Sequence, residues 1–172
     1  MISGCSSGGK STLIDELARR GHATVPEPGR RVVREELALG GTALPWADAE
    51  AFVDRIIALA MADYEAAAGN AGWTFIDRGL IDALSAHATV RGTGFPHERP
   101  AGYPYHRQVF LAPPWPEIYV TDGERQHGLA EAEREYQRLL ALYPDLGYEV
   151  IVLPIVPVTE RADFVERTLE TP

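Results

Sequence analysis

Gly4-Cys5-Ser6-Ser7-Gly8-Gly9-Lys10-Ser11-Thr12 is the stretch of this sequence that decides the fold. It satisfies in full the pattern of glycine, four residues, glycine, lysine, and serine or threonine. The glycines let the backbone turn tightly enough to aim successive N–H groups at one point. Leu13 and Leu17 follow at helical spacing, and the N-terminus of that helix adds a positive dipole. The pattern predicts a phosphate-binding loop (P-loop) in which every residue from Gly4 to Thr12 binds ATP or GTP.

The use of lysine supports the same interpretation. Of the 16 basic residues, only Lys10 is a lysine, and every other one is an arginine. A compact ammonium suits the β- and γ-phosphates, whereas a planar guanidinium does not fit the same cradle. We expect Lys10 to reach these phosphates and the Ser11 hydroxyl to ligate Mg²⁺.

Length, charge and cysteine content limit the classes of protein to which this chain can belong. A chain of 172 residues predicts a single domain over residues 1–172. The formal charge of −9 argues against a nucleic-acid partner, and no apolar run approaches the roughly 20 residues that cross a bilayer. Cys5 is the single cysteine, which excludes an internal disulfide and a thiolate zinc site. With no signal peptide in view, we expect a cytoplasmic protein whose oligomeric state the sequence leaves open.

Short apolar runs alternate with segments of helical spacing along the chain. The runs cover residues 22–25, 73–76, 109–111 and 148–153, with helices expected at 30–39, 47–68, from 80 onward, 129–143 and 160–169. This alternation predicts an α/β fold with a parallel sheet covered on both faces. Only Met1, Ile2 and Ser3 precede the loop, although strands usually have about five residues. We therefore expect the first strand to be truncated.

Four features occur along the chain in the order typical of one known group: the P-loop, Glu27-Pro28, Asp77-Arg78-Gly79 and residues 110–115. The chain resembles the small AAA-type ATPase domains related to ribosylnicotinamide kinase, within the nucleoside and nucleotide kinase class of P-loop proteins. The resemblance covers nearly the whole chain. It implies a three-layer P-loop NTPase sandwich with a five-stranded parallel sheet of order 2-3-1-4-5. The implied strands are residues 1–3, 22–26, 73–77, 108–112 and 148–153.

Two carboxylates are candidates for the chemistry. Asp77 follows a predicted buried strand, and ligands of open α/β sheets bind at the carboxyl ends of the strands. It can hold Mg²⁺, accept a proton, or simply cap the next helix. Glu27 ends another strand, and Pro28 restrains where its carboxylate points. A glutamate in a similar Glu-Pro corner of deoxynucleoside kinases takes the proton from the acceptor hydroxyl, although an exposed turn glutamate is the simpler alternative.

The arginines divide into those implied by the resemblance and those that the helix pattern explains. By resemblance, Arg78 contacts phosphate, and Arg125 belongs to a lid that closes over the transferring phosphoryl group. Arg134 and Arg138 are equally consistent with a salt-bridged helix surface. Arg30 and Arg34 lie on the same helix face, where they can bind an anionic acceptor or form a solvated surface paired with Glu35 and Glu36.

Together these features predict a Mg²⁺-dependent phosphotransferase that uses ATP or GTP. The acceptor would be a small hydroxyl-bearing metabolite, such as a nucleoside or a ribosyl compound. Glu27 or Asp77 would deprotonate it, while Arg78 and Arg125 stabilise the transferring phosphoryl group. The alternative is a regulatory ATPase that hydrolyses ATP to drive a conformational change, without a small-molecule acceptor.

Overall fold

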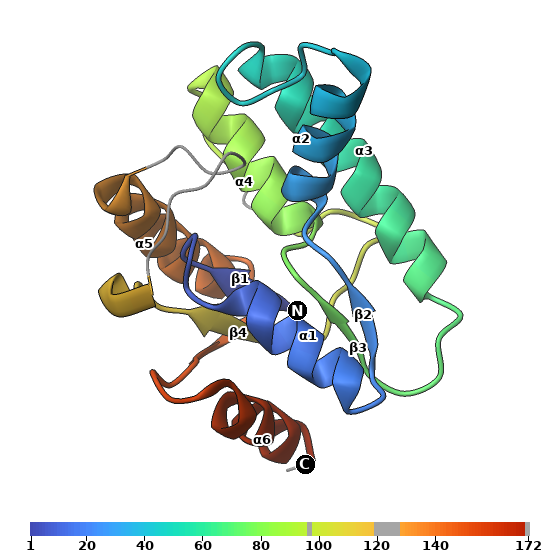
Figure 1. Ribbon diagram of the computed structural model, residues 1–172, viewed down its shortest axis with the longest axis vertical. Helices are drawn as coiled ribbons and strands as arrows, with labels where there is room; N and C mark the ends of the chain where they lie inside the picture. The colour runs from blue at the N-terminus through green and yellow to red at the C-terminus, as the bar shows by residue number, and fades with distance from the viewer. Residues whose placement is uncertain (96–97, 119–127, 171–172) are drawn as a thin grey trace.

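The P-loop connects strand β1 (Ile2–Gly4) to helix α1 (Lys10–Arg19), near the centre of the molecule in Figure 1. The computed structural model describes residues 1–95, 98–118 and 128–170. Strand β4 (Gln108–Ala112) pairs with β1 on one side and with β5 (Glu149–Val152) on the other, and both pairings are parallel. All three residues of β1 are buried.

A second parallel pair joins β2 (Ala23–Val25) to β3 (Thr74–Ile76). The β2-β3 pair contacts β1 just after β3, where Asp77 forms a parallel bridge with Ile2 and the Arg78 N–H donates to the Ile2 carbonyl at 2.9 Å. The strands thus form two sheets, β2-β3 and β1-β4-β5, linked at this one bridge. The parallel strands lie where the sequence predicts them, but a continuous sheet of order 2-3-1-4-5 stays a prediction, because β3 and β1 share a bridge and not a ladder.

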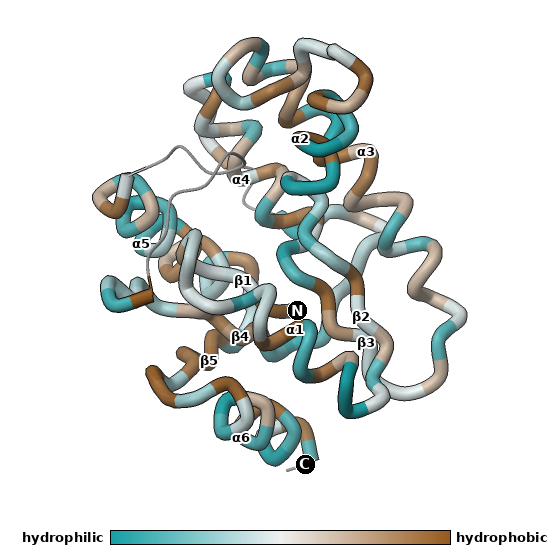
Figure 2. The backbone as a smooth tube through the Cα atoms, viewed as in Figure 1, coloured by the Kyte–Doolittle hydropathy of each residue, from teal (hydrophilic) through white to brown (hydrophobic). Residues whose placement is uncertain are grey.

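Alternating side chains of the strands divide the core into two faces. Ile2 and Phe110 pack with α1 and with α6 (Val158–Glu170). Val109 and Leu111, one residue away on β4, pack instead with α5 (Leu129–Asp145). Successive residues of a strand point to opposite faces, so a fully buried strand needs apolar residues at every position. Helices therefore cover both faces, and the apolar colour in Figure 2 follows the strands between them.

The remaining helices form a group beside β2 and β3 (Figure 1). They are α2 (Pro28–Leu39), α3 (Ala49–Ala67) and α4 (Leu80–Arg91), and their shared core includes Val32, Ile56 and Leu80. Helix α2 begins two residues earlier than the predicted residue 30, because Pro28 occupies a position of the first turn where its missing N–H costs nothing. Glu27 is consequently the N-cap residue of α2. A short 3₁₀ helix, η1 (Pro116–Ile118), follows β4. In the described ranges, no helix has the length and apolar character needed to cross a membrane.

Candidate functional site

The backbone of the P-loop depends on three glycines. Gly4 has φ +110°, and an added Cβ would lie 2.4 Å from the carbonyl oxygen of Ala112. Gly8 lies so close to β4 that a Cβ there would be 3.0 Å from the Pro113 carbonyl oxygen. Gly9 has φ +74° immediately before α1. The loop is therefore held against the end of β4 in a left-handed turn that leads into the N-terminus of α1, where unpaired N–H groups attract anions.

Lys10 is buried beneath the loop that it belongs to. Its ammonium donates to the Cys5 carbonyl at 2.8 Å and lies 3.4 Å from the Gly4 carbonyl. Burial lowers the pKa of Lys10 most, the charge of Arg78 lowers it further, and Asp77 opposes both. An ammonium has three donors, so Lys10 can hold the loop and still bind a phosphate oxygen. The loop and its lysine therefore fit the phosphate groups of a nucleoside triphosphate.

Ser11 and Asp77 come together as candidate metal ligands. The Ser11 hydroxyl donates to Oδ2 of Asp77 at 3.1 Å, and the other oxygen of this buried carboxylate has no hydrogen-bond partner. Burial raises the pKa of Asp77 to about 6, with Lys10 pulling it down and Glu27 pushing it up. Mg²⁺ commonly takes one or two carboxylates and substrate phosphates, with water filling the other positions. The pair fits Mg²⁺, although residues 1–95, 98–118 and 128–170 contain no cluster of three or more histidine, cysteine or carboxylate ligands.

Arg78 is held among carboxylates. Its two terminal nitrogens donate to the two oxygens of Glu135 at 2.8 and 2.9 Å, and one of them also donates to the Gly4 carbonyl at 3.0 Å. Burial disfavours the charge of Glu135, yet Arg78 outweighs it and lowers the pKa of that carboxyl group. The Arg78 Nε lies 3.4 Å from Glu27. The structure therefore places Arg78 as a support between the P-loop, Glu27 and α5.

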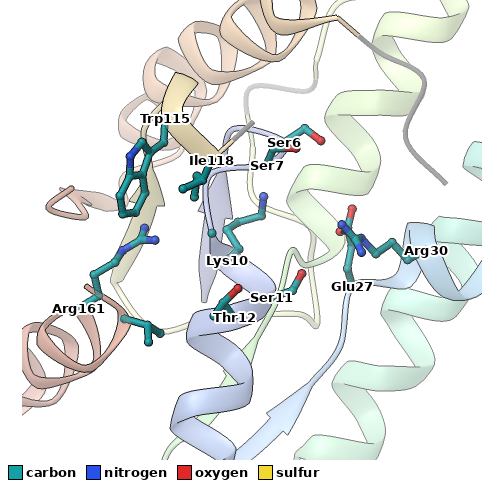
Figure 3. Close-up of a pocket in the computed structure, with 12 residues that line it drawn as sticks. Ser6, Ser7, Lys10, Ser11, Thr12, Glu27, Arg30, Trp115, Ile118 and Arg161 are labelled. Carbon is teal, nitrogen blue, oxygen red and sulfur yellow. Dashed lines mark ion pairs between the residues drawn. The ribbon is translucent and has the colours of Figure 1, made fainter. Parts of the chain in front are cut away.

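A cavity of about 330 Å³ lies over the P-loop. Figure 3 shows that it runs from Glu27 and Arg30 at one end, past Lys10, to Trp115 and Arg161 at the other. This shape suits an elongated ligand whose phosphates lie on the loop, with distinct chemistry at its two ends.

A second cavity, of about 180 Å³, lies between α2, α3 and α4. Its apolar wall includes Val33, Phe52 and Ile56, and its charged side chains include Arg78, Asp82 and Glu135. Ser6, Glu27 and Arg30 line both cavities. The two cavities therefore meet at the Glu27 end of the first one.

Glu27 lies at this junction because β2 ends just before it and α2 begins just after it. One carboxylate oxygen is 3.4 Å from Nε of Arg78 and the other is 3.4 Å from Nε of Arg30. The side chain is partly exposed to the cavities, at 22%. Its carboxylate is oriented by two cations while remaining within reach of a ligand.

Asp82 also lines the second cavity, but unlike Glu27 its carboxylate is engaged in hydrogen bonds within the protein. It accepts hydrogen bonds from Ser3, from the Tyr143 hydroxyl at 2.7 Å and from the Gly79 N–H at 3.2 Å. These contacts engage both carboxylate oxygens, and they fix α4 to β1 and α5. Asp82 is thus a structural carboxylate.

Other predicted side chains have different outcomes. Arg125 lies outside the described residues. Arg138 donates to the Ser85 hydroxyl at 3.0 Å, away from the P-loop.

Sequence reasoning missed Asp82, Glu135 and Arg161. Asp82 carried a usable signal, because an acidic residue three positions after Gly79 suits the first turn of a helix. Glu135 and Arg161 lie among the alternating charges of amphipathic helices, where nothing in the sequence distinguishes a buried charge from a solvated one.

Comparisons with known proteins place this geometry in a family. The sequence model of the AAA domain family matches residues 1–161, and no curated protein matches the sequence significantly. The shikimate kinase from Acinetobacter baumannii in complex with shikimate has a similar fold, with a TM-score of 0.55 at 15% identity over 98% of this chain and 90% of that one. So has the deoxyadenosine kinase from M. mycoides with products dCMP and a flexible dCDP bound, with a TM-score of 0.55 at 14% identity over 99% of this chain and 97% of that one.

At these identities the solved structures show the fold alone, and they confirm the predicted P-loop α/β fold of the kinase class. The family match covers most of the chain and includes the P-loop, the Asp77-Arg78 pair and Glu27. The chain therefore belongs to the AAA domain family and has the P-loop fold found in small-molecule kinases.

Proposed function

We propose that this protein is a Mg²⁺-dependent phosphotransferase. It transfers the terminal phosphoryl group of ATP or GTP to a hydroxyl group of a small metabolite, such as a nucleoside or a ribosyl compound. The observation that carries the proposal is the pair of cavities that meet at Ser6, Glu27 and Arg30. A kinase must bind two substrates in contact, whereas a plain ATPase needs only one cavity and water.

The roles follow from the positions of the side chains. The loop N–H groups and Lys10 bind the phosphates, and Ser11 with Asp77 holds Mg²⁺. Mg²⁺ neutralises charge on the phosphate oxygens when it is bound. Because Glu27 lines both cavities, it orients the acceptor hydroxyl and accepts its proton as the new O–P bond forms and the nucleoside diphosphate leaves.

The arginines act around this centre. Arg30 places a positive charge at the junction, 3.4 Å from the Glu27 carboxylate. Arg78 orients Glu27 through its Nε while its terminal nitrogens remain on Glu135 and the Gly4 carbonyl. For Arg125, closure over the transferring phosphoryl group rests on the family resemblance.

The second cavity favours an uncharged acceptor. Three carboxylates (Glu27, Asp82 and Glu135) line it, against the guanidinium groups of Arg30 and Arg78, and one of its walls is apolar. An acceptor that already carries a phosphate would meet an excess of negative charge. A nucleoside suits this cavity better than a nucleoside monophosphate. The two solved kinases with this fold are described with small molecules bound, shikimate in one and dCMP with dCDP in the other, which supports a small-molecule acceptor.

The test is nucleotide turnover with Mg²⁺ against a panel of nucleosides and ribosyl compounds, each beside its 5′-monophosphate and beside water alone. We expect a nucleoside or ribosyl compound to raise turnover at least about tenfold, with its monophosphate far less effective. Turnover that no acceptor accelerates would favour the regulatory ATPase instead.

A matched pair of variants on α4 locates the acceptor. Ala86 lines the second cavity, whereas Val90, one turn later, is exposed. Ala86→Phe should remove the acceptor-dependent turnover and keep nucleotide binding, and Val90→Phe should change neither. An Ala86→Phe protein that still responds to the acceptor would place the acceptor elsewhere.

A further inference from the structure

Arg161, on α6, is a buried cation with an incomplete set of partners. Its side chain is 2% exposed, and Nη1 donates to the Gly8 carbonyl at 3.0 Å. Nε and Nη2 have no hydrogen-bond partner, and Arg161 makes no ion pair within the part of the chain that the structure describes. Burying hydrogen-bond donors without acceptors is costly, so such an arrangement requires an explanation.

The two unpartnered nitrogens form one edge of the guanidinium group. Their N–H groups point in parallel, as a fork that fits two neighbouring acceptor atoms. Phosphate oxygens offer such a pair, and so do O6 and N7 of guanine. The remaining terminal nitrogen, Nη1, is the one that holds the P-loop.

The position of Arg161 distinguishes these two kinds of partner. It lines the first cavity together with Val158, and it lies with Trp115 and Ile118 at the end opposite Glu27 (Figure 3). The phosphates lie on the loop, and the transferring one faces Glu27. The base is the part of the nucleotide left for the Trp115 end, where apolar side chains suit a flat ring.

We propose that the Nε–Nη2 edge of Arg161 binds O6 and N7 of the nucleotide base, so that the site prefers guanine to adenine. Adenine places an amino donor beside N7, which opposes one of the two N–H groups, whereas guanine presents two acceptors. Both nitrogens are screened from water, and the Trp115 ring centre lies 5.6 Å from the guanidinium carbon. The base therefore reaches the fork only when the side chains that cover these two nitrogens move aside. This inference rests on the proposed nucleotide site and deepens it.

Binding measurements without any acceptor test the proposal. Calorimetry with Mg²⁺ compares non-hydrolysable GTP and ATP analogues with inorganic tripolyphosphate, which has no base. The wild type should bind the GTP analogue at least about tenfold more tightly than the ATP analogue. Arg161→Lys keeps the charge and loses the fork, so it should weaken GTP binding about 10- to 100-fold more than it weakens tripolyphosphate binding. Arg167→Met, at an exposed arginine of the same helix, is the matched control and should change none of the affinities.

Two ligands provide a test that needs no variant and no assumption about its folding. Inosine triphosphate keeps O6 and N7 and should bind like GTP, whereas 7-deaza-GTP lacks the N7 acceptor and should bind more weakly. Equal binding of GTP and ATP by the wild type, or of GTP and 7-deaza-GTP, would overturn the proposal. Loss of tripolyphosphate binding in Arg161→Lys, equal to the loss for GTP, would overturn it too, because Arg161 would then act only on the loop or the phosphates. Selective GTP binding without acceptor-stimulated turnover would reject the kinase function and leave this inference standing.

Discussion

The Ser11 hydroxyl donates a 3.1 Å hydrogen bond to Oδ2 of Asp77, across 66 positions of sequence. This contact joins the first turn of α1 to the end of β3, so the phosphate loop and the strand-end carboxylate form one unit. Oδ1 of Asp77 has no hydrogen-bond partner, although the side chain is only 1% exposed. A buried carboxylate with an unused oxygen is costly for the protein alone and suited to a cation.

The cost of burying the Asp77 carboxylate should make the stability difference between the wild type and Asp77→Asn depend on pH. The pKa of Asp77 is raised from 3.8 to about 6, so the folded protein binds a proton more tightly than the unfolded chain. The stability that this carboxyl group contributes is present below about pH 4 and is lost as the pH rises through 6. In EDTA at pH 7.5, Asp77→Asn should therefore be more stable than the wild type, by about 3 kcal/mol at most.

Urea denaturation from pH 7.5 to 4 measures this difference, which should shrink as the pH falls. Asp15→Asn, at an exposed acid of α1, is the control and should show no such trend. If Asp77→Asn is less stable than the wild type at pH 7.5, Asp77 is not a strained carboxylate.

Lys10→Ala should weaken nucleotide binding about 30-fold or more, because truncating one partner of a buried charged contact costs at least about 2 kcal/mol. Lys10 is buried in the loop, on the Cys5 carbonyl. Calorimetry with a non-hydrolysable nucleotide measures the loss, and a thermal melt establishes that the variant is folded. Wild-type affinity in a folded Lys10→Ala protein would refute the nucleotide site.

Glu27→Gln should lower the rate of phosphoryl transfer about 100-fold or more while nucleotide affinity changes little, as expected for the loss of a general base. The amide keeps the shape of the side chain at the junction of the two cavities but cannot accept the proton. Single-turnover kinetics separate this effect from binding. A silent Glu27→Gln with a strong effect of Asp77→Asn on transfer would move the base to Asp77.

Comparing Gly4→Ala with Gly21→Ala separates two costs to stability: a left-handed backbone conformation, and the steric contact of a new Cβ with β4. Both glycines have positive φ, +110° and +95°, but an added Cβ at Gly4 would lie 2.4 Å from the Ala112 carbonyl, and at Gly21 it would meet nothing within 4 Å. Gly21→Ala should cost about 1–2 kcal/mol of stability from the left-handed conformation alone. Gly4→Ala should cost about 1–3 kcal/mol more and should also weaken nucleotide binding, because the loop must move. Equal losses in thermal denaturation would mean that the contact with β4 does not constrain the loop.

The sequence by itself determined the P-loop and the α/β class. Local chemistry suffices for both: the turn from Gly4 to Gly9 needs glycine at particular positions, and the helix from Lys10 follows at once. The apolar runs before Asp77 and after Arg107 identified strands β3 and β4, since a strand buried on both faces is apolar throughout. The first residue of α2 was misplaced because Pro28 starts a helix as readily as it ends a strand.

Only the tertiary structure decided which charges meet. Arg78, which lies between β3 and α4, pairs with Glu135 of α5 and lies 3.4 Å from Glu27 at the N-cap of α2. Arg161 of α6 is buried against Gly8 of the P-loop. Each of these contacts joins residues far apart in the sequence. A charged residue on an amphipathic helix has the same local pattern whether it faces water or a neighbouring loop. Its burial depends on how the helices pack, and this packing involves residues far away in the sequence. The local sequence therefore does not predict it.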